Sequence, residues 1–374
     1  MKKYLGIGLI LAVSSMAPLR AQIVCTGPGC QYLPLSQATL DQMYYDFKTQ
    51  YTDQLFKDMA AAGVLANLTG APTGTVNLYG WTIGASAGLG YIPIKEVSIP
   101  ITGYGELKDI PRAGGAVNPR IFFGANVGWL LNQAYDPWGD GESSEPFFLS
   151  LSRFDLYGSF IQDRRHYVMQ DSGQVTVNTR NLGFDVRYHL VEGKPLAAGP
   201  LLRFLGVSVG AGYHTAAMDI TAIQNQNQKM KITLTGGSNL IWDGANQGKI
   251  QTQVKSMPLE IMTGLQILYA LNMSFGGGMS INRGSADVTL TRLGPVYLSN
   301  DSAALLAAAT GQTVASSAYN SYLTMQVTGS GQAPRNMAYA KLGLDFNILW
   351  FKIFAEGLWA KRAYGANLGV RWQM

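Results

Sequence analysis

The sequence predicts an all-β fold, a closed antiparallel transmembrane β-barrel of about ten strands that follows an N-terminal amphipathic helix. Three observations support this prediction. Most of the chain alternates large apolar residues with small residues at every second position. Only 14% of the residues are charged, against about 25% in a typical soluble domain, while 47% are hydrophobic. Beyond residue 20, no apolar stretch approaches the roughly 18 residues of a spanning helix, which excludes a helical membrane protein.

Residues 1–21 have the pattern of a cleaved secretory signal. Lys2 and Lys3 supply the positive start, an apolar run follows, and small residues precede the expected cut after Ala21. Removing this segment takes away three basic residues and lowers the formal net charge from +5 to about +2. A chain so nearly neutral gives no indication of a nucleic acid partner.

A short cysteine loop follows the expected cut. Cys25 and Cys30 enclose Thr-Gly-Pro-Gly, and in an exported chain two cysteines separated by turn residues predict a disulfide. Lipid attachment at Cys25 and two free thiols are the alternatives. Val24 stands where a lipidation signal carries a small residue. Two isolated cysteines do not predict a metal site.

Residues 36 to 62 form the predicted amphipathic helix. Apolar residues recur there at steps of three or four, with Asp and Lys on the opposite side. Ser36 or Thr39 is the expected N-cap and Gly63 the expected end. Residues 68–75 contain two glycines and a proline and are expected to be a linker. The region 22–74 therefore holds the cysteine loop and the helix.

The predicted barrel occupies residues 75–374. Between Trp81 and Tyr91 large apolar residues share one face and Gly, Ser and Thr the other, over about 33 Å of strand, or about 25 Å of height at a 40° tilt. A soluble β-sandwich also alternates, but its outer face would carry Lys and Glu. Ten strands are predicted: 75–91, 117–133, 147–163, 175–190, 201–217, 255–269, 273–289, 338–349, 351–361 and 363–374.

The connections between these strands alternate between short and long, as bacterial barrels require. The turns near 270–272 and 349–351 are short and would be periplasmic, with 134–146 as a longer exception. Residues 302–309 are expected to form a short helix that points either into the lumen or outward. Further strands within the long connections would raise the strand number to twelve or fourteen, and eight is the lower limit of the prediction. The long external connections are predicted at 92–116, 218–254 (a solvent-exposed hairpin) and 290–337.

The C-terminal strand carries the most specific pattern. Its alternate residues are aromatic or apolar up to the terminus: Tyr364, Leu368, Val370, Trp372 and Met374. This resembles the assembly signal of bacterial outer-membrane β-barrel proteins, which the barrel-assembly machinery reads by strand addition. The match departs from the pattern in ending on methionine instead of an aromatic residue.

With the signal, the helix and the glycine-rich strands, the chain is also similar to surface barrel proteins of leptospiral spirochaetes, a group associated with adhesion to host matrix. The resemblance implies an integral protein of the bacterial outer membrane with surface-exposed loops. Its implied partners are outer-membrane lipid, the barrel-assembly machinery and host extracellular matrix proteins.

Charged residues occur on the lumenal face of the predicted strands with both signs on most strands. A ring of one sign would indicate an ion-selective pore, whereas mixed signs predict a cross-strand network that rigidifies or occludes the lumen. The predicted network comprises Arg153, Asp155, Asp185, Arg187, His189, Lys341, Asp345, Lys352, Glu356 and Arg371.

The lumenal face is otherwise lined mainly by glycine and other small residues, so a barrel of ten strands would hold water or accept another element. The helix is the spare element. We expect it to insert as a plug with Leu40, Phe47, Tyr51 and Leu55 against the wall, and Tyr51 beside Gly88. A helix that caps the periplasmic mouth, or lies flat at the membrane interface, is the alternative.

An adhesin-like surface protein is therefore the favoured function. A narrow or plugged, porin-like pore for small or apolar solutes is the alternative, and an outer-membrane hydrolase is third. No enzyme activity is expected, because His166, His189 and His214 have no serine two residues away. No cofactor or metal is expected, since the acidic residues near Asp136 fit a solvated turn rather than a calcium loop.

Overall fold

The chain divides into two compact units in the computed structural model. The first unit comprises Met1–Tyr45, Gln226–Gln247 and Thr289–Thr328, and the barrel unit comprises Asp46–Asn225, Gly248–Val288 and Gly329–Met374. The structure describes residues 22–27, 37–69, 78, 80–101, 105–131, 150–169, 173–196, 201–224, 228–233, 239–298 and 321–374.

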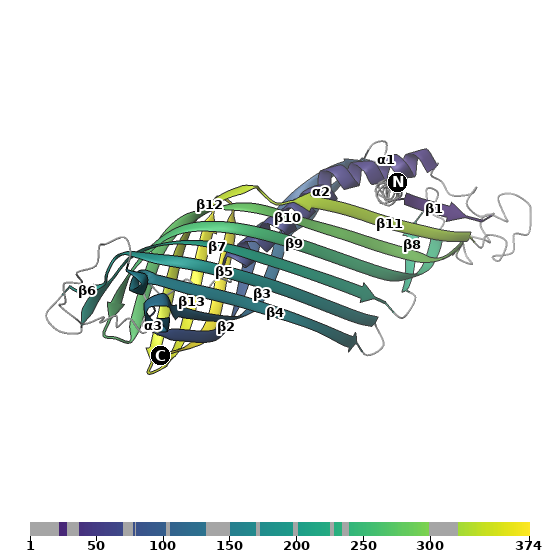
Figure 1. The fold of residues 1–374 in the computed structure, drawn as a ribbon. Coiled ribbons are helices and arrows are strands. Elements are labelled where there is room, and N and C mark those ends of the chain that lie inside the picture. Colours follow the sequence, from purple (N-terminus) through teal and green to yellow (C-terminus); the bar gives the residue numbers. More distant parts are fainter. Residues whose placement is uncertain are drawn as a thin grey trace, which may run out of the picture. The chain divides into compact units, whose positions relative to one another are not determined.

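Ten antiparallel strands of the described residues form a closed ring, which confirms the predicted fold class. Each strand pairs with the next in the chain, and the last pairs with the first; Figure 1 shows β4, β5, β7, β9 and β10 side by side. The ring consists of β2 (Trp81–Ile101), β3 (Gly105–Asn126), β4 (Phe154–Met169), β5 (Gly173–Val191), β7 (Leu202–Ile223), β9 (Asn239–Ile267), β10 (Leu271–Leu298), β12 (Asn336–Ile348), β13 (Phe351–Ala360) and β14 (Ala363–Gln373).

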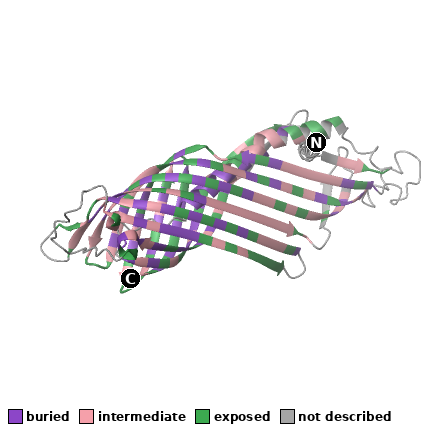
Figure 2. Ribbon diagram, in the orientation of Figure 1, coloured by how far each residue is buried: buried purple, intermediate pink, exposed green. Residues whose placement is uncertain are grey.

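Exposed and buried residues alternate along these strands (Figure 2). In β2, Ile83 and Leu89 are exposed, whereas Ser86 and Gly88 are buried. The large apolar residues therefore face outward and the small residues face inward, which is the arrangement of a barrel in lipid and the reverse of a soluble protein.

The β14–β2 ladder closes the ring. It runs from Tyr364 opposite Tyr91 to Gln373 opposite Thr82, and the backbone N–H of Trp81 donates to the Met374 carbonyl over 3.1 Å. The assembly-signal residues Tyr364, Leu368, Val370, Trp372 and Met374 are all exposed on the outer face of this strand.

The strands on the side of the long connections extend further than predicted. Much of 92–116 and 290–337 is strand instead of loop, including β11 (Ser321–Gln332), and the hairpin predicted within 218–254 is present as β8 (Gln228–Thr233) paired with the start of β9. Paired strands satisfy the backbone N–H and C=O groups that an open loop would leave to water. Segments 134–146 and 302–309 lie outside the described residues.

The N-terminal helical region is longer than predicted and consists of three parts. These are α1 (Gln37–Phe47), a π-helical turn (Lys48–Thr52) and α2 (Asp53–Thr69). The predicted end at Gly63 is wrong, because Gly63 is buried inside α2 and its small size brings the helix close to Val254. Residues 68 and 69, expected in the linker, complete α2. None of the described helices is both long and apolar enough to span a membrane.

The smaller described elements complete the chain. β1 (Gln22–Thr26) pairs with β11 from Gln22 opposite Gln326 to Thr26 opposite Tyr322. β6 (Lys194–Pro195) pairs with β7. α3 (Val127–Leu130) and a 3-10 turn (Leu151–Arg153) lie between β3 and β4 in the chain.

Candidate functional site

The lumen of the barrel unit holds the C-terminal half of α2. Every residue from Ala60 to Thr69 is buried, and α2 contacts β2, β3, β7, β13 and β14, which lie around the ring. Ala62, Val64, Leu65 and Leu68 form one hydrophobic cluster with inward residues such as Tyr339 and Leu358. Phe56 and Ala60 form a second cluster with Ala286 and Val288.

Wall glycines allow this close packing. A β-carbon at Gly90 would overlap the Ala62 carbonyl, and one at Gly114 would overlap the carbonyl of Asp58. A β-carbon at Gly331 would meet the backbone between Phe56 and Lys57. The helix backbone therefore lies directly against strand backbone, which only glycine permits.

The part of the helical region that lies against the barrel wall comes later in the chain than the sequence indicated. Ala62, not Tyr51, lies beside Gly90, two residues from Gly88. Tyr51 is half-buried, and Leu55 is half-buried against the Phe56 cluster. The side chains of Leu40 and Phe47 lie outside the described part of the structure. Residues 60–66 thus lie where Tyr51 was expected, because this smooth alanine-rich segment fits the bare wall better than bulky side chains do.

Buried cations and local hydroxyls satisfy the C-terminal end of α2. Arg120 Nη2 donates to the Asn67 carbonyl over 2.9 Å, and Lys341 Nζ donates to the Leu68 carbonyl over 3.4 Å. Thr69 Oγ1 donates to the Leu65 carbonyl over 3.0 Å. The last carbonyls of a helix have no partner within the helix and carry its partial negative charge, so these two cations stabilise α2 in its place.

Asn67 joins α2 to the three strands β3, β7 and β9. Its Nδ2 donates to the His214 carbonyl (3.2 Å) and to Ser256 Oγ (3.1 Å), while its Oδ1 accepts from Arg120. Arg120 also bonds to His214 Nδ1 over 3.0 Å, and His214 Nε2 bonds to Asp185 over 2.9 Å. All five side chains are buried, so the lumen at this level is filled by hydrogen-bonded protein.

A second buried cluster surrounds Lys341. Its Nζ lies 2.6 Å from Glu260 and 3.3 Å from Glu356. Tyr339 donates to Glu260 over 2.7 Å, and Arg187 lies 3.7 Å from the other Glu260 oxygen. The cluster is balanced, with two carboxylates against two cations. Balanced charges offset one another's desolvation, whereas a single unpaired charge at such a site is strongly destabilising.

A third group of polar contacts lies at the end of the barrel that holds the short turns. Asp155 accepts from His189 (2.6 Å), from Asn126 Nδ2 (2.9 Å) and from the backbone N–H of Leu78 (3.2 Å). Arg371 bonds to Asp345 over 2.5 Å. These contacts link β3, β4, β5, β12 and β14 at that end of the barrel.

Almost the whole chain matches one protein family. The model of the Lsa36-like family matches residues 18–374. The chain belongs to the Lsa36-like family. This confirms the resemblance to leptospiral surface proteins, and the protein is an integral outer-membrane β-barrel. A search of curated proteins found no match.

Solved structures similar to this Lsa36-like protein include outer-membrane barrels of different roles. The translocator domain of the autotransporter NalP from Neisseria meningitidis is 12% identical over 79% of this chain and 88% of its own, with a TM-score of 0.28. A FadL homologue of Pseudomonas aeruginosa is 10% identical over 85% and 98%, with a TM-score of 0.25. The attachment invasion locus protein Ail of Yersinia pestis is 8% identical over 79% and 100%, with a TM-score of 0.17.

Most residues of the predicted charge network of this Lsa36-like protein lie in the Lys341 cluster or in the group around Asp155 and Arg371. The other three are Asp185, Arg153 and Lys352. Asp185 pairs with His214, and Arg153 pairs with Glu192 at 2.7 Å, just before β4. Lys352 lies opposite Arg371 across the β13–β14 ladder. The sequence prediction missed Asn67, Arg120 and Glu260, together with the role of His214. The sequence did contain a signal for Arg120, Glu260 and His214, because each is a polar residue on the inward face of a predicted strand.

The three histidines of the Lsa36-like protein lie in different surroundings. His166 is exposed and bonds to Thr176 Oγ1 over 3.0 Å, while the other two histidines pair with buried aspartates. Within the described ranges, no group of three or more His, Cys, Asp or Glu residues is arranged to hold a metal ion. The arrangement can hold a helix in place and exclude solvent.

Proposed function

We propose that this Lsa36-like protein is a plugged barrel that serves as an adhesin-like scaffold, and that its first unit binds extracellular partners, including host matrix proteins. The observation that carries the proposal is the filled lumen. α2 and the buried polar clusters occupy the space that a solute would need, and the mixed charges select no ion. A barrel without a path through it is best suited to presenting what lies outside the membrane.

The direction of α2 supports surface display of the N-terminal segment. Near its start, Asp58 bonds to Arg112 over 2.9 Å, on the side of the long connections. Near its end, Thr69 lies against Gly365, and Leu78 then reaches Asp155 on the side of the short turns. The chain therefore runs through the lumen toward the periplasm before β2 begins, with the start of α2 toward the outer end.

Contacts within the first unit support a folded binding surface. The N-terminal strand β1 pairs with β11, which belongs to the β10–β12 connection. Trp242 is 3% exposed, lies 4.8 Å from the guanidinium of Arg292 and accepts from it through its carbonyl (3.2 Å). We infer that a Cys25–Cys30 disulfide restrains the loop after β1; Cys30 lies outside the described residues.

Two measurements on the protein in lipid test this function. Planar bilayers should show no defined conductance steps, and immobilised matrix proteins should bind the reconstituted barrel. A variant in which a Gly-Gly turn replaces residues 230–242 removes the β8–β9 hairpin and should lose binding while keeping the heat-modifiable gel mobility of a folded barrel. Stepwise conductance of the wild type with no matrix binding would establish the pore instead. Ester hydrolysis that a histidine substitution abolishes would establish an enzyme.

A further inference from the structure

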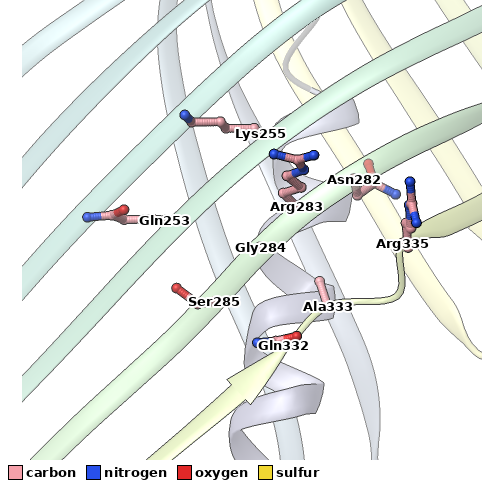
Figure 3. A pocket seen from close by; sticks show the side chains of 9 residues that line it. All are labelled: Gln253, Lys255, Asn282, Arg283, Gly284, Ser285, Gln332, Ala333 and Arg335. Atoms are coloured by element: carbon pink, nitrogen blue, oxygen red, sulfur yellow. The ribbon is translucent and has the colours of Figure 1, made fainter. Parts of the chain in front are cut away.

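A basic hollow of about 530 Å³ lies on the outer wall of the barrel unit, where β9, β10 and the turn before β12 meet (Figure 3). Lys255, Arg283 and Arg335 line it, and all three are exposed. Gln253, Asn282 and Gln332 add amide groups. The backbone N–H of Asn282 donates to the Arg335 carbonyl over 2.6 Å, so the turn that carries Arg335 is fixed to β10.

The hollow lies where the lipid-facing surface ends. On β9 the exposed residues Leu259 and Met257 lie on the same face as Lys255, on its periplasmic side. On β10 the exposed Met279 and Ile281 lie in the same way on the periplasmic side of Arg283. From the turn at Tyr269, Lys255 is fourteen residues away, about 35 Å of height at a 40° tilt. The apolar band of such barrels is about 25 Å tall, so the hollow lies above this band, on the outer side.

The charge of the hollow is uncompensated. None of the three cations forms a salt bridge with any residue that the structure describes. Asp287, the next acidic residue on the outward face of β10, does not line the hollow. Three cations held together repel one another unless an anion lies between them, so the site is suited to a ligand with two or more negative charges.

We propose that this hollow binds the phosphorylated head group of an outer-leaflet lipid. Two arginines and a lysine can contact phosphate oxygens by charge-assisted hydrogen bonds, and the amides of Gln253 and Gln332 can contact sugar or phosphate oxygens. The apolar residues directly below, Met257 and Ile281, would contact the acyl chains of the same molecule. A free phosphate would gain only the first of these interactions, which favours the lipid.

The test compares three probes on the purified barrel in neutral detergent. These are lipid A with its phosphates, the same lipid after enzymatic dephosphorylation, and inorganic phosphate. Wild type should bind one molecule of phosphorylated lipid A, seen by native mass spectrometry. Changing Lys255, Arg283 and Arg335 together to Gln should weaken this binding at least tenfold.

The matched control is the Arg164→Gln and Arg180→Gln double variant, which removes two exposed cations of β4 and β5 that do not line the hollow. It should bind as wild type does, and heat-modifiable mobility verifies that every variant is folded. Equal binding by the triple variant, or equal binding of dephosphorylated lipid, would overturn the proposal. Inorganic phosphate that binds as tightly as the lipid would assign the site to a soluble anion. These outcomes do not depend on the adhesin role.

Discussion

At the scale of single residues, Arg120 connects α2 to β7 across the lumen. It is 1% exposed and connects the end of α2 to His214, and its charge lies close to Asp185. Removing it would leave the Asn67 carbonyl without its donor and the Asp185–His214 pair without its neighbouring cation. Such uncompensated buried groups are more destabilising than the intact pair is stabilising.

We expect Arg120→Ala to lower the free energy of unfolding by about 3 to 5 kcal/mol, because it leaves the buried Asp185 without its neighbouring cation and the Asn67 carbonyl without its donor. Urea unfolding in lipid vesicles, followed by tryptophan fluorescence, measures it. Arg165→Ala is the control, because Arg165 is an arginine with a carboxylate partner, Asp163 at 2.6 Å, but is exposed. It should leave the transition where it is, since exposed pairs contribute little. Equal shifts in both variants would contradict the role of Arg120.

At the scale of elements, the fit between α2 and β2 depends on the absence of a side chain at Gly90. Gly90→Ala should destabilise the barrel by about 1 to 3 kcal/mol, because the new methyl group meets the backbone of Ala62 and forces the helix to move. Gly115→Ala is the control: Gly115 lies opposite Tyr91, next to Gly90, on the outward side, with open space around its α-carbon. Matching unfolding curves for the two variants would show that α2 does not lie against β2.

Cross-linking tests the depth of α2 in the lumen. In a Cys25→Ser, Cys30→Ser background, cysteines at Thr69 and Gly365 should form a disulfide in the folded barrel, because a β-carbon at Gly365 lies next to Thr69. The pair Tyr51 and Gly88 should not, since Tyr51 precedes Ala62 by about 16 Å of helix. Bridging of the second pair alone would mean that the helix is inserted more deeply, with Tyr51 at the level where Ala62 lies in the structure.

The strands were predictable from the sequence because each is read from its own residues. Alternation alone identifies the outward Ile83 and Leu89 and the inward Ser86, and the ten strands follow in chain order. The end of α2 was not predictable in this way. Gly63 is a local stop signal, but packing against Val254 and cations at Asn67 and Leu68 override it, and these partners come from strands far along the chain. Hydrogen-bond partners across the lumen depend on register, which periodicity does not supply.

At the scale of the whole molecule, the path of the chain through the lumen predicts which parts reach the cell surface. An epitope tag inserted before Gln37 should bind antibody on intact cells, and a tag in the turn at 349–350 should do so only after permeabilisation. The expectation follows from α2, whose start lies on the side of the long connections. If both tags required permeabilisation, the expectation would be wrong and the N-terminal segment would lie in the periplasm.

The closure of β14 on β2 also constrains the order of events during biogenesis. Tyr91 and Tyr364 are far apart in the chain, so their ladder is entropically a late step, and the helix must already be in place when the ring closes around it. The proposed surface location of the segment ahead of α2 then requires this segment to cross the membrane while still extended. A fast-folding domain fused before residue 22 should jam this passage and reduce the yield of heat-modifiable barrel, whereas an unstructured fusion of equal length should pass. Equal yields from both fusions would mean that the ring closes first and admits the helix afterwards.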